Sequence, residues 1–163
     1  MSSDFYEISI APFAGIIIKI CRAYTDNQAD FEDYYQEVCL QIWRSKDSYN
    51  GKSAWATWVY RVALNVCLTL IKKRKEQPQD PHEQPAKQVA SVENQAFANE
   101  SLNQLYAAIR QLSEIDRAVI LLYLEEKSYQ EIATVIGGNA NSIGVRISRI
   151  KTRLKKLLHG QFN

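Results

Sequence analysis

The sequence predicts an all-α protein made of two small helical domains joined by a flexible linker, the second of them a helix-turn-helix domain. Three observations support this fold class. Apolar residues recur at steps of three and four along both halves of the 163 residues, three of the four prolines fall within residues 76–89, and a glycine turn joins two predicted helices. We expect a first domain over residues 1–76, a linker over 77–100 and a second domain over 101–163, although residues 76–89 could also be a long loop within one domain.

Two helices are expected in the first 45 residues. Pro12 can open the first, whose apolar residues recur at helical spacing at Ile16, Ile17, Ile20, Cys21 and Tyr24. The second spans about residues 30–45 and carries two adjacent apolar stripes that we expect to face a core: Phe31, Tyr35, Cys39 and Trp43, and Tyr34, Val38 and Ile42. The opposite face carries Asp33, Gln36, Glu37 and Gln41, and it is either a plain solvated face or a docking surface for a basic partner.

A turn-rich stretch over residues 47–53 follows, because Asn50-Gly51 favours positive backbone angles. The third helix, about residues 54–75, is expected to bury one apolar stripe: Trp58, Val62, Ala63, Val66 and Leu70. Its outward polar row is Arg61, Asn65, Thr69 and Lys72. The basic end, residues 72–75, either complements the helix dipole or binds a polyanion.

Aromatic residues accompany this basic stretch, at Tyr49, Trp55, Trp58 and Tyr60. Aromatic rings beside basic and hydrogen-bonding side chains are the combination that holds single-stranded nucleic acid, through base stacking and phosphate pairing. The same rings could equally belong to the core.

The second half predicts four helices. Apolar stripes mark the first two: Leu102, Leu105, Ile109 and Leu112, then Ile115, Val119 and Leu122. Ser128-Tyr-Gln-Glu131 is a capping box that opens a short helix with Ile132, Val135 and Ile136 inward, and residues 137–139 form a tight turn. The last helix begins near Asn139. Its apolar stripe, expected to face the core, is Ile143, Ile147, Ile150, Leu154 and Leu157.

Short helix, glycine turn and longer helix together indicate a helix-turn-helix. Opposite the apolar stripe, the last helix carries Asn141, Ser142, Val145, Arg146 and Arg149, then Lys151, Arg153, Lys155 and Lys156. A recognition helix reads base edges with its first residues and holds phosphates with basic ones. A plain helical hairpin is the alternative, but the exposed face has no acidic residue to balance its charge.

The charge distribution supports two contacts with a polyanion. The net charge is only +2, yet residues 38–76 carry eight basic and two acidic residues, and residues 137–163 carry six basic and none acidic.

Composition and motifs argue against a disulfide-bonded protein, a zinc protein, an enzyme and a membrane protein. We expect Cys21, Cys39 and Cys67 to be reduced core residues, because their spacing forms neither a CxxC pair nor a zinc site. Both histidines, His82 and His159, lie where nothing would hold a catalytic base, and no phosphate loop or nucleophile motif occurs. We expect no enzymatic activity, no metal, no cofactor, no signal peptide and no membrane insertion.

Several of these segments, in this order, resemble the sigma-70 family, specifically its small extracytoplasmic-function (ECF) type. They are residues 31–37 (Phe-Glu-Asp-Tyr-Tyr-Gln-Glu), Ile42-Trp43, Tyr49-Asn-Gly51, residues 58–65 (Trp-Val-Tyr-Arg-Val-Ala-Leu-Asn) and residues 128–133 (Ser-Tyr-Gln-Glu-Ile-Ala). The resemblance covers roughly residues 12–158. It implies a sigma factor that directs core RNA polymerase to promoters, with a first half that binds the clamp helices of the largest subunit and opens the minus-ten element. The second half would bind the minus-thirty-five element as duplex and contact the polymerase flap.

The resemblance also implies roles for individual residues. Polymerase binding would fall to Asp33, Gln36, Glu37, Gln41 and Trp43. Minus-ten binding would fall to Tyr49, Asn50, Gly51, Lys52, Ser53, Trp58, Arg61, Asn65 and Lys72, with Tyr49 and Asn65 lining the pocket for a flipped base. Minus-thirty-five binding would fall to Asn141, Ser142, Val145, Arg146, Arg149 and Arg153. The sequence departs from the family at Gly144, where Lys or Arg is common.

The family further implies a bacterial, cytoplasmic protein regulated by an anti-sigma factor, which could hold it at the membrane. Two other functions remain open on the residues alone: a helix-turn-helix regulator that acts without polymerase, and a helical adaptor that binds only proteins.

Overall fold

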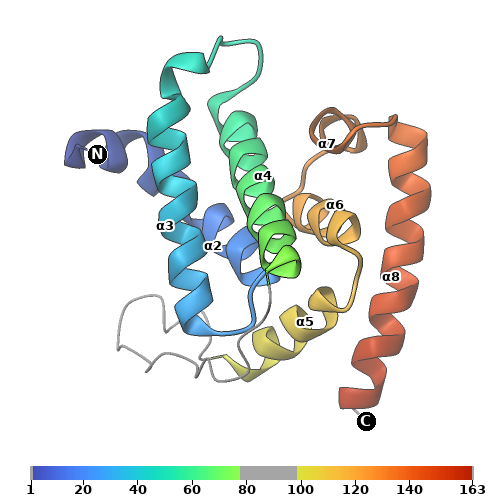
Figure 1. Cartoon of the computed structure of the whole chain (residues 1–163). Coiled ribbons are helices and arrows are strands. Elements are labelled where there is room, and N and C mark those ends of the chain that lie inside the picture. Colours follow the sequence, from blue (N-terminus) through green and yellow to red (C-terminus); the bar gives the residue numbers. More distant parts are fainter. Residues whose placement is uncertain (1, 78–98, 163) are drawn as a thin grey trace. The chain divides into compact units, whose positions relative to one another are not determined.

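The computed structural model describes residues 2–77 and 99–162, which form helices and short turns without a strand (Figure 1). The chain divides into two compact units, residues 1–94 and 95–163. The all-α, two-part prediction is confirmed. The predicted linker, its three prolines and His82 lie outside the described residues, apart from positions 77, 99 and 100.

The first unit begins with an almost continuous helical run. It consists of α1 (Ser3–Phe5), a π-helical turn (Tyr6–Ile10), a 3-10 turn (Ala11–Phe13) and α2 (Ala14–Ala23). The sequence suggested that Pro12 opens the first helix. In the structure Pro12 lies inside the 3-10 turn, and α2 begins two residues later. The preceding turns have no apolar repeat, since Ile8 is exposed and Ile10 fully buried, so periodicity could not reveal them.

Two longer helices complete this unit, α3 (Gln28–Ser45) and α4 (Trp55–Glu76), joined by a 3-10 turn (Lys46–Ser48) and a loop. Figure 1 shows α3 and α4 side by side and running in opposite directions. The side chain of Asn27 caps α3 by accepting a hydrogen bond from the Asp30 amide at 2.8 Å, which starts this helix two residues earlier than predicted.

The buried face of α4 differs from the prediction. Only Ala63 of the expected stripe is buried, whereas Trp58, Val62, Val66 and Leu70 are half-exposed. The core instead contains Val59, Tyr60, Ala63, Leu64 and Cys67. Apolar residues occur on more than one side of α4, so helical periodicity alone cannot choose the face that packs against α2 and α3.

Two aromatic residues of α3 are also less buried than expected. Tyr35 is half-buried, and its hydroxyl is hydrogen-bonded to that of Tyr6 at 2.9 Å; Trp43 is half-buried against Phe5. Both contact the amino-terminal turns that the sequence had not revealed.

The three cysteines are free and buried, as expected. Burial raises the pKa of the Cys39 thiol to about 11, and a hydrogen bond with Cys67, together with burial, raises that of Cys21. These groups therefore stay protonated at neutral pH and pack as small apolar residues.

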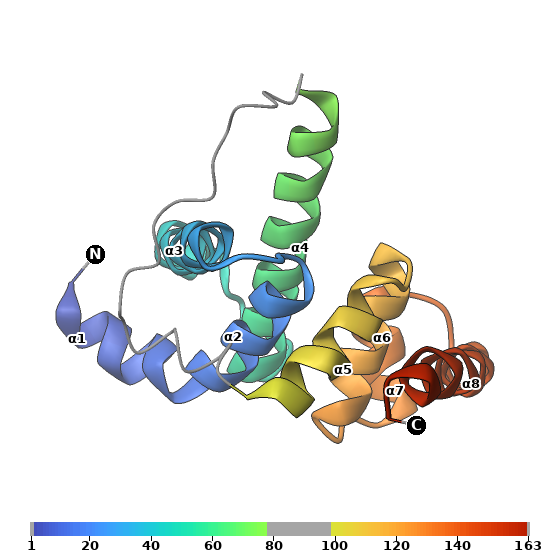
Figure 2. The same ribbon diagram turned by 90° about the horizontal axis from the view of Figure 1, so that it is seen from below.

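The second unit contains α5 (Glu100–Arg110), α6 (Glu114–Leu124), α7 (Tyr129–Ile136) and α8 (Ala140–Phe162). The capping box at Ser128 and Glu131 is confirmed, and the turn before α8 uses positive φ angles at Gly137 (105°) and Gly138 (90°). Figure 2 looks along α8 and shows the other three helices on one side of it. The inward stripe of α8 is buried as predicted at Ile143, Ile147, Ile150 and Leu154, and half-buried at Leu157.

Two residues expected on inward stripes are exposed. Leu102 retains 45% of its accessible surface and Ile115 retains 40%. Both lie in the first turn of their helices, before the chain reaches the packed part of the unit.

Candidate nucleic-acid interfaces

Three aromatic rings form a cluster where the loop before α4 meets the helix. The Trp55 and Trp58 rings stack with centroids 4.8 Å apart, and the Tyr49 ring lies 5.1 Å from Trp55 and 5.6 Å from Trp58. The Tyr49 hydroxyl donates to the carbonyl of Ser53 at 2.5 Å, and the Lys52 amide donates to the Asn50 side chain at 3.0 Å. The loop predicted to capture a base is therefore closed by its own side chains, with a positive φ of 75° at Gly51.

The amino-terminal turns support this cluster. The Trp55 indole Nε1 donates to the carbonyl of Ser9 at 2.8 Å. Phe5 makes edge contacts with Trp55 at 6.4 Å and with Trp43 at 5.1 Å. Sequence reasoning missed this role of residues 5–9, because the contacts span more than 35 positions along the chain.

A groove of about 430 Å³ runs between α3 and α4. Its wall on α4 contains the misassigned stripe Trp58, Val62, Val66 and Leu70, with Asn65, Thr69 and Lys73 beside it; α3 and the following turn contribute Glu37, Gln41, Ser45 and Ser48. The groove brings Asn65 and Trp58 together. Tyr49 contacts Trp58 but is not itself part of the lining. An apolar wall with an exposed amide suits the face and the edge of an unpaired base.

The predicted docking face on α3 is accessible in part. Asp33 and Gln36 are exposed, while Glu37 and Gln41 are half-exposed along the groove. Glu37 lies 3.7 Å from Arg44, a surface pair that contributes little to stability. The Lys46 ammonium lies 3.8 Å from the centroid of the Trp43 ring.

At the basic end of α4, Arg74 is paired with an acidic residue, while Lys72 and Lys73 point to the surface. Arg74 makes two hydrogen bonds to the carboxylate of Asp30, at 2.7 and 2.5 Å, and so ties the end of α4 to the start of α3. This pairing holds the pKa of Asp30 below its ordinary value and raises the pKa of Arg74. Lys72 and Lys73 are exposed, and Arg61 is half-exposed in the same outward row.

In the second unit, the predicted reading residues are exposed on α8: Asn141, Ser142, Val145, Arg146, Arg149 and Arg153. The Ser142 hydroxyl accepts from the Asn139 amide at 3.2 Å and donates to its carbonyl at 2.9 Å, so it is engaged in capping the helix. The Asn139 side chain completes the cap by accepting from the Ser142 amide at 2.8 Å.

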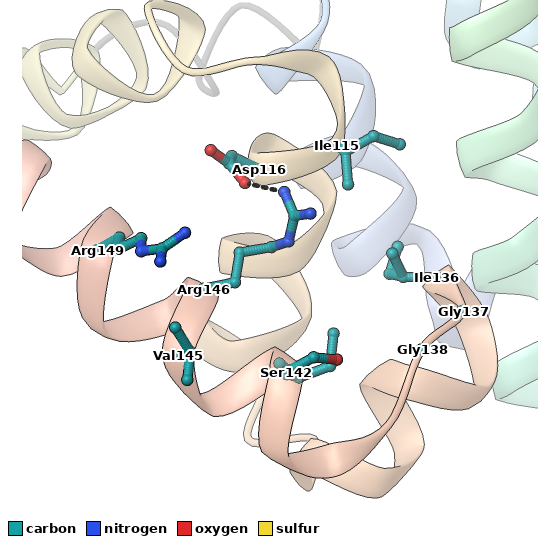
Figure 3. A pocket seen from close by; sticks show the side chains of 10 residues that line it. Ile115, Asp116, Ile136, Gly137, Gly138, Ser142, Val145, Arg146 and Arg149 are labelled. Atoms are coloured by element: carbon teal, nitrogen blue, oxygen red, sulfur yellow. Dashed lines mark hydrogen bonds and ion pairs between the residues drawn. The ribbon is translucent and has the colours of Figure 1, made fainter.

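Arg146 is held by an acidic partner from another helix. Its Nη1 donates to Oδ1 of Asp116 in α6 at 2.7 Å, as Figure 3 shows. The two residues line a pocket of about 780 Å³ with Arg149, Val145 and Ile115, among others. Sequence reasoning missed Asp116, whose place in the first turn of a helix is explained by the dipole alone.

Gly144 has a packing partner. A Cβ at this position would lie 3.2 Å from Cε2 and 3.4 Å from Cδ2 of Tyr129, the first residue of α7. Tyr129 was not among the predicted site residues, although it directly follows Ser128 of the predicted capping box.

Within the described ranges, no helix is long and apolar enough to cross a membrane. Residues 2–77 and 99–162 also contain no group of His, Cys, Asp or Glu that could hold a metal ion.

Two family models match the chain, one in each unit. The model of sigma-70 region 2 matches residues 10–77, and that of sigma-70 region 4 matches residues 102–154.

Curated relatives carry related names. The chain is 27% identical to the ECF RNA polymerase sigma factor SigG of Mycobacterium tuberculosis over 88% of its own length, but it spans only 46% of that relative. It is 24% identical to the RNA polymerase sigma-H factor of Pseudomonas aeruginosa, over 94% of this chain and 86% of the relative. The chain is 26% identical to the ECF RNA polymerase sigma-E factor of Escherichia coli, over 75% of this chain and 70% of that relative.

Solved structures share the fold. The sigma factor RpoE of Bartonella quintana, in complex with the anti-sigma factor NepR, aligns with a TM-score of 0.71 at 20% identity, over 97% of this chain and 98% of that one. CnrH, in complex with the cytosolic domain of CnrY, aligns with a TM-score of 0.70 at 18% identity. The alignment covers 98% of this chain and 90% of CnrH.

Proposed function

Because the chain belongs to the sigma-70 family and is of its ECF type, we propose that it is a dissociable subunit that directs core RNA polymerase to specific promoters and starts transcription there. The observation that carries the proposal is the order of the two matches. Region 2 falls in the first compact unit and region 4 in the second, so one chain combines both promoter-binding parts.

In the first unit, residues 1–76 bind core polymerase and the minus-ten element. The exposed acidic and amide side chains of α3 suit a basic partner surface such as the polymerase clamp helices. The groove beside Trp58 and Asn65 and the closed loop at residues 49–53 receive the unpaired minus-ten strand, and Lys72 and Arg61 hold its phosphates.

In the second unit, residues 101–163 bind the minus-thirty-five element as duplex and contact the polymerase flap. The supporting features are the helix-turn-helix and an exposed face of α8 whose charged residues are all basic up to residue 159. The protein acts without catalysis of its own, in the bacterial cytoplasm, under an anti-sigma factor. The structural relative solved with the anti-sigma factor NepR supports this last point.

The test is reconstitution of the full chain with bacterial core polymerase, followed by transcription from a library of random promoters. We expect a stable complex and transcripts that start downstream of a shared pair of sequence elements. A chain that binds duplex DNA but not core polymerase would instead be a helix-turn-helix regulator. A chain that binds neither DNA nor polymerase would be an adaptor for other proteins.

A charge reversal on the docking face sharpens the test. Glu37→Lys should weaken the complex with core polymerase without unfolding the chain. Glu7→Lys makes the same charge change on an exposed residue of the π-helical turn, outside the predicted docking residues, and should leave the complex intact.

A further inference from the structure

The reading face of α8 contains a notch without charge. It measures about 510 Å³ and is lined by Tyr129, Ala140, Asn141, Gly144, Val145 and Ser148. Two of its walls are unusually accessible for apolar side chains, since Tyr129 is 41% exposed and Val145 49%. Asn141 and Val145 are among the residues expected to bind the minus-thirty-five element, whereas Tyr129, Gly144 and Ser148 have no role so far.

Gly144 allows the notch to exist. Glycine inside a helix is disfavoured relative to alanine, and the backbone here is helical, so no positive φ demands it. The Tyr129 ring supplies the reason, because it lies against the glycine so closely that a Cβ would meet it at 3.2 Å. The ring thus occupies the space into which a basic side chain at this position would extend.

The surroundings of the notch determine which part of a duplex it would meet. Arg146 and Arg149 follow it on the exposed face of α8, and basic residues continue to Lys156, which suits the phosphates on both sides of a groove. A recognition helix flanked in this way presents its first two turns to base edges in the major groove. The apolar group on a base edge there is the 5-methyl group of thymine.

Asn141 adds a second contact to the same notch. Its carboxamide is exposed at the start of α8, and an asparagine amide pairs with the N6 and N7 atoms of adenine. An apolar wall and an amide side by side match the two major-groove features of one A·T pair.

We propose that the notch beside Gly144 reads a thymine of the promoter duplex through its 5-methyl group, with the Tyr129 ring and Val145 as its walls and Asn141 on the adenine. This proposal rests on the proposed function, since it requires α8 to lie in the major groove. It makes Tyr129, which belongs to α7, a specificity-determining residue.

The experiment uses holoenzyme reconstituted from the full chain and core polymerase. A duplex library randomised over the minus-thirty-five region is selected for binding, and each thymine in the selected sequence is then replaced by deoxyuridine, which lacks only the methyl group. We expect one thymine whose replacement weakens binding about four-fold, the value of one buried methyl group. Placing 5-methylcytosine there should bind better than cytosine.

Variants connect that thymine to the notch. Tyr129→Ala and Val145→Ser should each abolish the difference between thymine and deoxyuridine at that position, while Tyr129→Phe should keep it. Lys156→Ala is the matched control, because it should weaken binding to all duplexes alike and leave the difference unchanged. Circular dichroism of Tyr129→Ala checks the fold, and Val145→Ser provides an independent test should that variant unfold.

The outcomes separate the two levels of the proposal. Enriched sequences in which no thymine responds to deoxyuridine would overturn the notch while the sigma-factor function stands. A thymine effect that persists in both notch variants would overturn it too. A library without any enriched sequence would overturn the proposed function, and the thymine contact with it.

Discussion

The long helices α4 and α8 differ in how well their sequences define the face that packs. In α8 the apolar residues form one narrow stripe between basic and polar ones, and that stripe is buried. In α4 apolar residues occur on several sides, and the stripe that looked most regular lies along an open groove. A helix with more apolar surface than its unit can cover retains some of it at the surface, where it is available to a ligand.

The largest effect is expected from truncating the buried stripe of α8, and a much smaller one from truncating the stripe of α4. Ile147→Ala removes a fully buried side chain and should lower the free energy of unfolding of the second unit by about 2 to 5 kcal/mol. Val66→Ala, in the groove of the first unit, should cost less than about 1 kcal/mol because its side chain is already half-exposed.

Fluorescence can follow the two units separately in urea. All three tryptophans, at positions 43, 55 and 58, lie in the first unit, so their emission should report its transition alone, while circular dichroism reports both units. Equal losses for the two variants would mean that the α4 stripe is as well packed as the α8 stripe, contrary to the structure.

Asn65→Ala tests whether the uncovered side of α4 binds an unpaired base. If the amide pairs with a base edge, its loss should reduce promoter opening by about 1 to 3 kcal/mol, while binding to core polymerase remains intact. Permanganate reactivity of minus-ten thymines measures the opening. Ser3→Ala, on an exposed residue outside the groove, is the control.

Templates melted in advance separate recognition from structure. A loss confined to one base at the captured position would place Asn65 in a reading pocket. Equal losses for all four bases would assign it a role in holding the loop.

Asp116→Asn tests the corresponding polar side of α8. Without the carboxylate, Arg146 is no longer held, and one negative charge is removed from the proposed DNA-binding face. We expect tighter binding to all duplexes and a preference for the best site that falls by about 1 kcal/mol, part of the value of a bidentate guanine contact. Dissociation constants for the best duplex and for single-base variants, at one salt concentration, measure both changes. An unchanged preference would show that Asp116 only stabilises the unit.

The smallest effect concerns the ion pair between α3 and the end of α4. The pKa of Asp30 is lowered by its hydrogen bonds from Arg74, so the pair stabilises the folded state at neutral pH, and this contribution is lost as the pH falls through the folded pKa. The Arg74 side chain is 50% exposed, so Arg74→Gln should cost no more than about 1 kcal/mol at pH 7. At pH 3, tryptophan fluorescence in urea should show a smaller difference between the two proteins. A difference that grows toward acid pH would contradict the assignment.

The sequence alone determined the fold class, the two halves and the helix-turn-helix. Local rules are sufficient for these features: the capping box at Ser128, the positive φ angles at Gly137 and Gly138, and the single stripe of α8 all depend on neighbours within a few positions. The residues of the candidate site were likewise predicted from their order along the chain. The partners that these residues contact could not be predicted from the sequence.

Tertiary structure decided which face of α4 is buried, because that choice depends on what α2 and α3 cover. It also decided the partners that come from distant positions: Ser9 for Trp55, Asp30 for Arg74, Asp116 for Arg146 and Tyr129 for Gly144. Each of these contacts forms only when separate helices pack together, and their spacing along the chain follows no helical period.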